Sequence, residues 1–244
     1  MDTAGEITGG LESQYTRVES YFSLKKENED LRRRLNELQN KQPQNFQASD
    51  TAQKIIADSI PYDTSGNTRK YLYMDAMVVN NSISQPNNFI TIHRGVKQNV
   101  QPKMVVISPN GVVGVVLDVN DNFATVMSML HKQSRISARL KKTGESGRIE
   151  WDGVNPQRVQ FRDIPKSVKV QVGDSVLTSQ YSDFPPGIMI GVIEKVILEK
   201  STNNYLLQVK PSTDFGRLQN VFVIHNLQRD EQLELEQRRT QKKK

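Results

Sequence analysis

Short apolar runs separated by turn residues fill the chain from about residue 51 to residue 226, and they constrain the fold more than any other feature. Runs rich in Val, Ile, Thr and Tyr, such as YLYMDAMVV, NFITIH, GVVGVVLDV, RISARL and VFVI, alternate with Gly, Pro, Asn and Asp. Regularly spaced strands of this length are typical of antiparallel barrels and sandwiches. Because no helix-length periodic segment interrupts them, we do not expect an alternating βαβ fold.

An internal repeat divides this region in two. VQPKMVVISPNGVVGVV (Val100–Val116) aligns with VQVGDSVLTSQYSDFPPGIMIGVI (Val170–Ile193), and each copy runs from a Val-rich strand through a second strand into a glycine-containing strand. A repeat of about 80 residues predicts two related domains. We expect one β-barrel over residues 51–130 and a second over 131–226, in sequential order, unless terminal strands are exchanged between them. Chance similarity of Val-rich strands is the alternative. The repeat marks six positions as structural turns: Gly111, Gly114, Gly173, Asp174, Gly187 and Gly191.

The segment 11–41 has neither proline nor glycine and carries a heptad pattern. Its a positions are Tyr21, Asn28 and Leu35, and its d positions are Leu24, Leu31 and Leu38. A helix with one narrow apolar stripe is marginal alone, so the pattern predicts a parallel homodimeric coiled coil, with asparagine at an a position favouring two strands. The alternative is a helix that lies on its own β-domain. We expect a flexible start at 1–10, a linker at 42–50 and a charged, mobile tail at 227–244.

Gly173-Asp174-Ser175 is identical to the tripeptide that precedes paired glycines in chymotrypsin-like serine proteases. A serine hydrolase also requires a base, an orienting carboxylate and an oxyanion hole. Val176 and Leu177 follow Ser175 where a tight donor loop would need glycines. The runs VKVQV and SVLTS instead predict a two-strand hairpin with Gly173-Asp174 at its turn. We therefore predict an ordinary strand residue at Ser175, with a chymotrypsin-like serine hydrolase as the alternative function.

Composition excludes other kinds of site. The chain has no cysteine, which removes disulfides, thiolate metal sites and cysteine nucleophiles. Its three histidines lack metal-ligand spacing: His93, His131 and His225. The segment LDVNDNF resembles part of a calcium loop but lacks the glycine and terminal glutamate, so a β-turn is expected. No phosphate-binding loop is present. We predict no cofactor, no metal and no catalytic residue.

The charge is concentrated at the C-terminal end. The net charge is +6, and Arg238, Arg239 and the three final lysines supply five of these charges. Such a tail is usually solvated, and the rest of the sequence shows no basic face for nucleic acid. We expect no nucleic-acid partner; binding of an anionic surface or nucleic acid through the tail is a third hypothesis. No apolar run approaches the roughly 20 residues of a membrane span.

Four segments stand in a characteristic order: LKKENEDLRRRLNEL, NFITIHRGVKQNVQPKMVVISPNGVVGVVLDV, GDSVLTSQYSDFPPGIMIGVI and VKPSTDFGRLQNVFVI. Together they resemble the MreC family of bacterial rod-shape-determining proteins, from about residue 24 to residue 224. In that family a membrane anchor precedes a dimerising coiled coil and two small β-barrels, which pair as in chymotrypsin-like proteases without a catalytic triad. The resemblance implies a mainly β fold of this kind and no enzymatic activity, since fold and function are separable.

The resemblance also implies a scaffold that organises peptidoglycan synthesis during cell elongation. The partners implied are a second copy of the chain and larger assemblies of it, a class B penicillin-binding protein, and MreD, RodA and MreB. The implied location is the bacterial inner membrane, single-pass, with the bulk in the periplasm. We expect this chain to be the extracytoplasmic part without the anchor. Gln180 stands where the family often has glycine, which is a departure at that turn.

Overall fold

The structure is a computed structural model that describes residues 25–42, 46–48, 67–199, 202–229, 231–232 and 238. The chain divides into two compact units, Met1–Asn45 and Phe46–Lys244. In the first unit, residues 25–40 form a helix, inside the predicted span of 11–41. Tyr21, Leu24, the expected flexible start and most of the tail lie outside the described residues.

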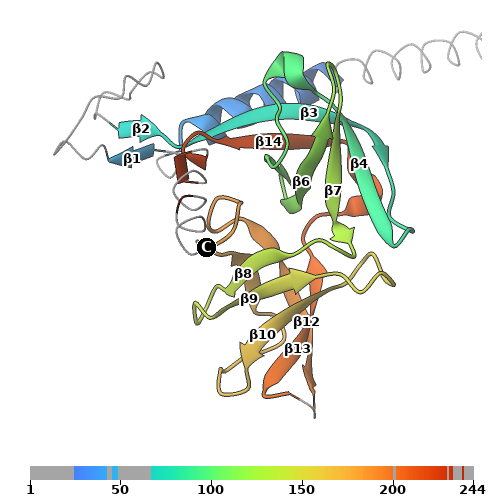
Figure 1. Ribbon diagram of the computed structural model, residues 1–244, viewed down its shortest axis with the longest axis vertical. Coiled ribbons are helices and arrows are strands. Elements are labelled where there is room, and N and C mark those ends of the chain that lie inside the picture. The colour runs from blue at the N-terminus through green and yellow to red at the C-terminus, as the bar shows by residue number, and fades with distance from the viewer. Residues whose placement is uncertain are drawn as a thin grey trace, which may run out of the picture. The chain divides into compact units, whose positions relative to one another are not determined.

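The first barrel is a closed antiparallel sheet in the order β14-β3-β4-β7-β6-β5 (Figure 1). Its strands are β3 (Tyr71–Asn81), β4 (Asn87–His93), β5 (Val105–Ser108), β6 (Gly111–Val119), β7 (Ala124–His131) and β14 (Asn220–Asn226). Alternate residues point inward, as the period of a strand requires. The fully buried core includes Ile90, Ile92, Val106, Val126 and Val223.

The second barrel is also closed, in the order β10-β13-β12-β11-β8-β9. Its strands are β8 (Ile136–Leu140), β9 (Ser146–Glu150), β10 (Val159–Pro165), β11 (Ser175–Thr178), β12 (Met189–Leu198) and β13 (Asn204–Pro211). Phe161, Ile190, Leu207 and Val209 fill its core. The predicted fold class of a helix followed by two small antiparallel barrels is therefore confirmed.

The boundary between the barrels corrects the sequential order expected from the sequence. Strand β14 follows the second barrel in the chain but pairs with β3 and β5 of the first. The second barrel is thus inserted between β7 and β14, and residues 220–226 belong to the first barrel. Closure explains this exchange, because β3 and β5 would otherwise each leave an unpaired edge.

Two further expectations differ from the structure. The run VKVQV lies in a loop and not in a strand: Val172 is 65% exposed, and no neighbouring strand pairs with the segment in the described sheets. In the expected linker, β1 (Phe46–Ala48) pairs with β2 (Asn67–Arg69) as a separate two-stranded sheet. Short 3-10 turns stand at η2 (Val96–Gln98) and η3 (Phe215–Arg217).

The internal repeat is present as a shared backbone frame. In the first barrel Lys103 N–H donates to the Val116 carbonyl (2.7 Å), and Val116 N–H donates to Met104 (2.8 Å). In the second barrel Gly173 N–H donates to Ile193 (2.8 Å), and Ile193 N–H donates to Asp174 (2.9 Å). Both turns use a left-handed residue, Lys103 at φ +72° and Gly173 at φ +94°.

Bulges recur at equivalent places in the two barrels. The β5–β6 register shifts next to Gly114 and the β11–β12 register shifts next to Gly191. A second shift lies beyond Val116 in the β6–β7 pair and beyond Ile193 in the β12–β13 pair. A bulge bends its strand and increases the local twist, so both barrels close through the same pair of bends.

Candidate functional site

The six positions expected at turns fall into two groups. Gly173, Asp174 and Gly187 lie in turns, and Gly187 has φ +90°. The other three are strand residues, which corrects their expected place: Gly111, Gly114 and Gly191. A Cβ at Gly114 would lie 2.1 Å from the Met127 carbonyl oxygen, and one at Gly191 would lie 2.2 Å from that of Lys210. These two glycines are needed because the backbone of the paired neighbouring strand, β7 or β13, lies where a Cβ would stand.

Gly111 lies where the barrels meet. Its φ is +155°, and an added Cβ would lie 2.3 Å from the carbonyl oxygen of Met189 in the second barrel. The Thr213 hydroxyl, in the segment between β13 and β14, donates to the Val112 carbonyl (2.9 Å) and lies 2.9 Å from the Ser108 hydroxyl. Thr213 and Ser108 are both buried. This buried, hydrogen-bonded contact joins the two barrels.

Ser175 is the first residue of β11 and pairs with Val192, as predicted for a strand residue. Its hydroxyl makes no hydrogen bond to any residue in the described part of the chain. The preceding carboxylate, Asp174, accepts a hydrogen bond from the Gln171 amide at 2.8 Å and so holds the turn. The geometry around Ser175 therefore lacks the base contact that activates a serine nucleophile.

The histidines have structural surroundings. His131 is buried, its Nδ1 accepts a hydrogen bond from the Gln133 amide (3.0 Å), and its ring contacts Phe89 edge-on. Burial lowers the pKa of His131 below its ordinary value, because the charged ring is disfavoured away from water. His93 stacks on Phe123 with ring centroids 4.9 Å apart. No cluster of three metal-ligating side chains exists among the residues that the structure describes.

The described part of the predicted coiled-coil seam is accessible. Leu31 and Leu38 at d are 56% and 63% exposed, whereas Leu35 at a is half-buried and Asn28 is exposed. Asp30 and Arg34 form an ion pair of 2.8 Å along one side of the helix. Large apolar side chains left exposed in a row on a helix can pack against a second helix.

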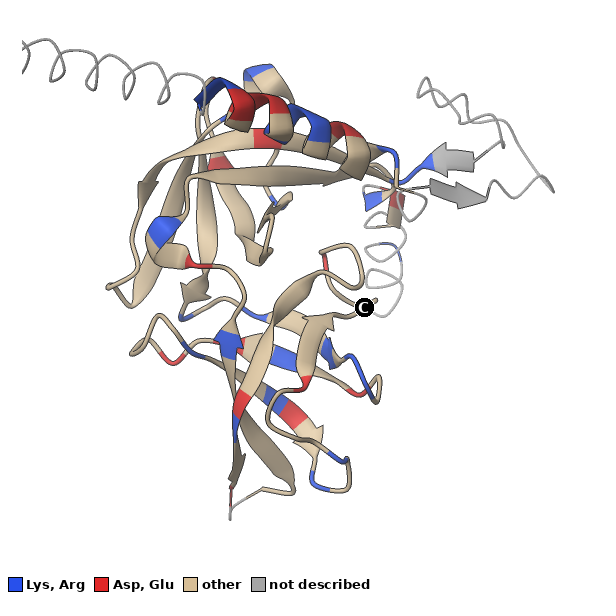
Figure 2. Ribbon diagram, turned by 180° about the vertical axis from the view of Figure 1, so that it is seen from behind, with Lys and Arg blue, Asp and Glu red and all other residues tan. Residues whose placement is uncertain are grey.

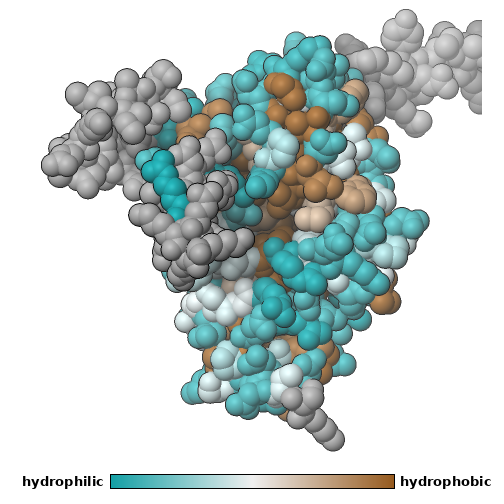
Figure 3. Space-filling model, viewed as in Figure 1, coloured by the Kyte–Doolittle hydropathy of each residue, from teal (hydrophilic) through white to brown (hydrophobic). Residues whose placement is uncertain are grey.

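An exposed apolar face lies on the first barrel, and the sequence interpretation missed it. It is defined by outward side chains of β3, β4, β6 and the β6–β7 turn: Met77, Val79, Phe89, Leu117 and Phe123. Met77 stands opposite His93, which stacks on Phe123, so His93 links these two members across neighbouring strands. Figure 3 shows apolar atoms gathered over β6 and β7. The signal in the sequence is that both alternating sets of residues in β3 and β6 are largely apolar.

The second barrel presents ion pairs instead. Three arginines surround Glu150: Arg135, just before β8, at 3.2 Å, Arg148 of β9 at 3.7 Å, and Arg162 of β10. Arg148 also pairs with Asp163 and Arg162 with Glu199. Figure 2 shows these alternating charges along the strands of the second barrel. Exposed pairs of this kind add little stability but keep the surface polar.

No helix in the described ranges combines the length and the apolar character that crossing a bilayer requires.

The family model described as the barrel core of the rod shape-determining protein MreC matches residues 78–225. The chain belongs to the MreC family. Curated relatives are cell shape-determining MreC proteins. The one from Listeria monocytogenes is 29% identical over 166 residues, which make up 66% of this chain and 56% of that protein. The one from Bacillus subtilis is 26% identical over 234 residues, 91% of this chain and 79% of that protein.

Solved MreC structures share the fold. The structure from Listeria monocytogenes has a TM-score of 0.59 at 27% identity and covers 91% of this chain and 94% of its own. MreC from Pseudomonas aeruginosa has a TM-score of 0.58 at 19% identity, with 62% of this chain and 97% of that chain covered. MreC from Helicobacter pylori, solved in complex with the penicillin-binding protein PBP2, has a TM-score of 0.51 at 18% identity, covering 65% of this chain and 99% of that one. These last two likenesses concern the fold alone.

Proposed function

We propose that this MreC-family chain is a non-enzymatic scaffold that dimerises through its N-terminal helix and binds a class B penicillin-binding protein during cell elongation. The match of residues 78–225 to the MreC barrel core carries this proposal. The complex of Helicobacter pylori MreC with PBP2 supports the partner class. The proposal includes an extracytoplasmic position at the inner membrane and membership of an assembly with MreD, RodA and MreB.

The exposed apolar face is the proposed contact for the penicillin-binding protein. A row of outward Met, Val, Leu and Phe side chains on rigid strands can supply the apolar centre of a protein–protein interface. The exposed large apolar residues of the second barrel are fewer on its strands: Val154, Val172 and Tyr181 lie in loops, and only Val192 and Leu198 lie on a described strand, β12. The first barrel therefore offers the larger continuous apolar contact.

Binding of the purified full chain to the extracytoplasmic region of a class B penicillin-binding protein tests this surface. The double variant Leu117→Ser with Phe123→Ser should weaken binding by at least about tenfold, because it removes buried apolar contact. The matched control is Leu198→Ser, which is 67% exposed on β12 of the other barrel. Unchanged affinity in the double variant would contradict the assignment. A drop in self-association without loss of partner binding would show that the face joins two copies of the chain.

Dimerisation is tested by light scattering of the full chain. Leu31→Asp combined with Leu38→Asp places charge in the seam and should convert dimer to monomer while the barrel spectrum stays unchanged. Arg33→Asp, at an f position on the opposite side, is the matched control and should remain dimeric. A double variant with the mass of the unsubstituted dimer would refute the coiled coil.

The serine hydrolase remains the competing function and has a direct test. Ser175→Ala should leave any background hydrolysis of ester or peptide substrates unchanged. A loss of hydrolysis specific to Ser175→Ala would establish the alternative and overturn the non-enzymatic proposal. Deleting residues 238–244 tests the third hypothesis in the same way, through salt-sensitive binding to anionic surfaces.

A further inference from the structure

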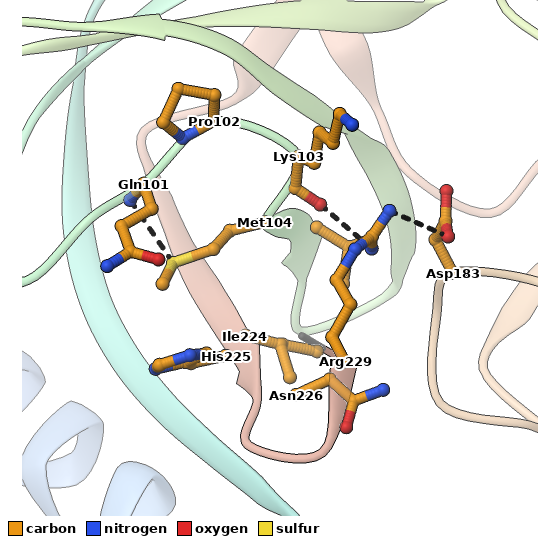
Figure 4. A pocket seen from close by; sticks show the side chains of 10 residues that line it. Gln101, Pro102, Lys103, Met104, Asp183, Ile224, His225, Asn226 and Arg229 are labelled. Carbon is orange, nitrogen blue, oxygen red and sulfur yellow. Dashed lines mark hydrogen bonds and ion pairs between the residues drawn. The ribbon is translucent and has the colours of Figure 1, made fainter. Parts of the chain in front are cut away.

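A small pocket of about 160 Å³ lies where the end of β14 faces the turn before β5 and a loop of the second barrel. Its floor is apolar and includes Met104 and Ile224, while Gln101 and Arg229 stand at its sides (Figure 4). This volume is well above the roughly 10–15 Å³ that a cavity needs to hold a single water. It suits a small ligand or the end of a larger one.

Arg229 is the polar centre of this pocket. Its Nη1 donates to the Lys103 carbonyl at 3.1 Å, and its Nη2 pairs with Asp183 of the second barrel at 3.0 Å. The side chain is only 20% exposed. Its Nε is buried and has no acceptor among the described residues. A buried donor without an acceptor is uncommon in folded proteins, and a bound acceptor is one explanation for it.

The chemistry around Arg229 selects the kind of acceptor. A guanidinium recognises a carboxylate through parallel N–H bonds, and here the Nε edge remains for such a contact. Asp183 already balances part of the positive charge, which disfavours a doubly charged phosphate more than a singly charged carboxylate. The apolar floor of Met104 and Ile224 fits a short aliphatic group next to that carboxylate.

We propose that this pocket binds a small monocarboxylate, of the size of an N-acylated amino acid or the C-terminal residue of a peptide. Arg229 binds the carboxylate, and Met104 with Ile224 contacts the aliphatic side chain. The bound carboxylate shares the guanidinium with Asp183, so binding weakens the link between Arg229 and the second barrel. Asp183 is 56% exposed and can leave this contact for solvent.

Nuclear magnetic resonance titration of the isotope-labelled full chain tests the site. The probe is N-acetylalanine, and the matched neutral probe is N-acetylalaninamide. The acid should produce saturable shifts at the Arg229 Nε–H and at the amides of Lys103 and Met104, and the amide should not. Equal responses to both probes would overturn the proposal, because they would show no role for the carboxylate.

Substitutions sharpen this test. Arg229→Gln should reduce affinity for the acid at least about tenfold, while Arg217→Gln, on a side chain 90% exposed, should leave it unchanged. Asp183→Asn removes the competing carboxylate and should tighten binding several-fold in a protein that keeps its fold. This variant decides the question even if Arg229→Gln fails to fold. Unchanged or weaker binding by Asp183→Asn would refute the shared guanidinium.

Discussion

Gly114 in the first barrel and Gly191 in the second occupy the same place, each close to a carbonyl of the paired neighbouring strand and each next to a bulge. Around this shared frame the barrels diverge. The β5–β6 connection is a tight turn from Ser108 to Gly111, whereas β11 and β12 are joined by the longer loop 179–188. The comparison shows that backbone constraints are kept in both copies, while loops and outer faces differ.

The outer faces of the two barrels differ in chemistry. The first exposes Met77, Leu117 and Phe123 together, and the second surrounds Glu150 with arginines. Inward residues are fixed by packing and cannot diverge freely. Outward residues are not constrained by core packing, so the surface of one barrel can become apolar and that of the other polar without a change of fold.

The largest predicted difference between the barrels comes from removing β14. A chain that ends at residue 219 should lose the first barrel, because β3 and β5 both lose a partner strand, while the second barrel keeps its closed sheet. Hydrogen exchange read by mass spectrometry should show residues 71–131 exchanging rapidly and 136–211 protected. A chain that ends at residue 229 is the control and should protect both. Protection of 71–131 in the shorter chain would contradict the insertion.

The longer loop of the second barrel should prove to be part of its core. Phe184 is 2% exposed, and Thr178 fixes the loop by donating to the Pro185 carbonyl (2.6 Å) and accepting from Ile188 N–H (2.9 Å). Phe184→Ala should lower the free energy of unfolding by about 3–5 kcal/mol, as for other buried phenylalanines. Tyr181→Ala in the same loop, 74% exposed, should change it by less than about 0.5 kcal/mol. Urea denaturation measures both, and similar values for the two variants would show that the loop does not pack as described.

The shared frame predicts matched effects at the two strand glycines. Gly114→Ala and Gly191→Ala each place a Cβ against backbone and should each cost about 1–3 kcal/mol of stability, within experimental error of one another. Gly144→Ala is a control for the loss of glycine, because it has φ +78° but no atom within 4 Å. Thermal or urea unfolding gives the three values. If only one of the two substitutions lowered stability, the two strand glycines would not have equivalent roles in the barrels.

The smallest effect separates the two left-handed turn residues. Lys103 adopts φ +72° where its counterpart is glycine, so Lys103→Gly should relieve strain and stabilise the protein by up to about 1 kcal/mol. Gly173→Ala at φ +94° should destabilise it by about 1–2 kcal/mol. Opposite signs in urea denaturation are the expected result, and equal signs would show that the two turns are not equivalent.

Much of this architecture follows from local sequence rules. The run GVVGVVLDV is a strand over its full length. Its own residues supply both the buried valines and the glycine at which the strand bends. Strand β9 carries no clear strand signal in the sequence, since SGRIE has a single buried apolar residue, Ile149, and is otherwise polar or glycine. VKVQV has the period of a strand but no partner to pair with in the described sheets.

Non-local features could not be predicted in this way. The pairing of β14 with β3 depends on closure of a sheet whose strands lie far apart in the chain. The apolar face depends on which side of each strand points outward, and a one-residue change of register reverses that assignment. The pocket around Arg229 combines three separate segments, and no spacing along the sequence marks it.

The place of β14 also sets the order in which the two barrels can close as the chain is synthesised. Chains are made from the N-terminus, and domains generally fold as they emerge. Here the barrel that begins first must wait, because its closing strand is synthesised only after residues 136–211. The second barrel can therefore complete itself while β3 to β7 are still an open sheet with two free edges. During that interval the edges of β3 and β5 lack the strand that closes the barrel and are open to pairing with another chain.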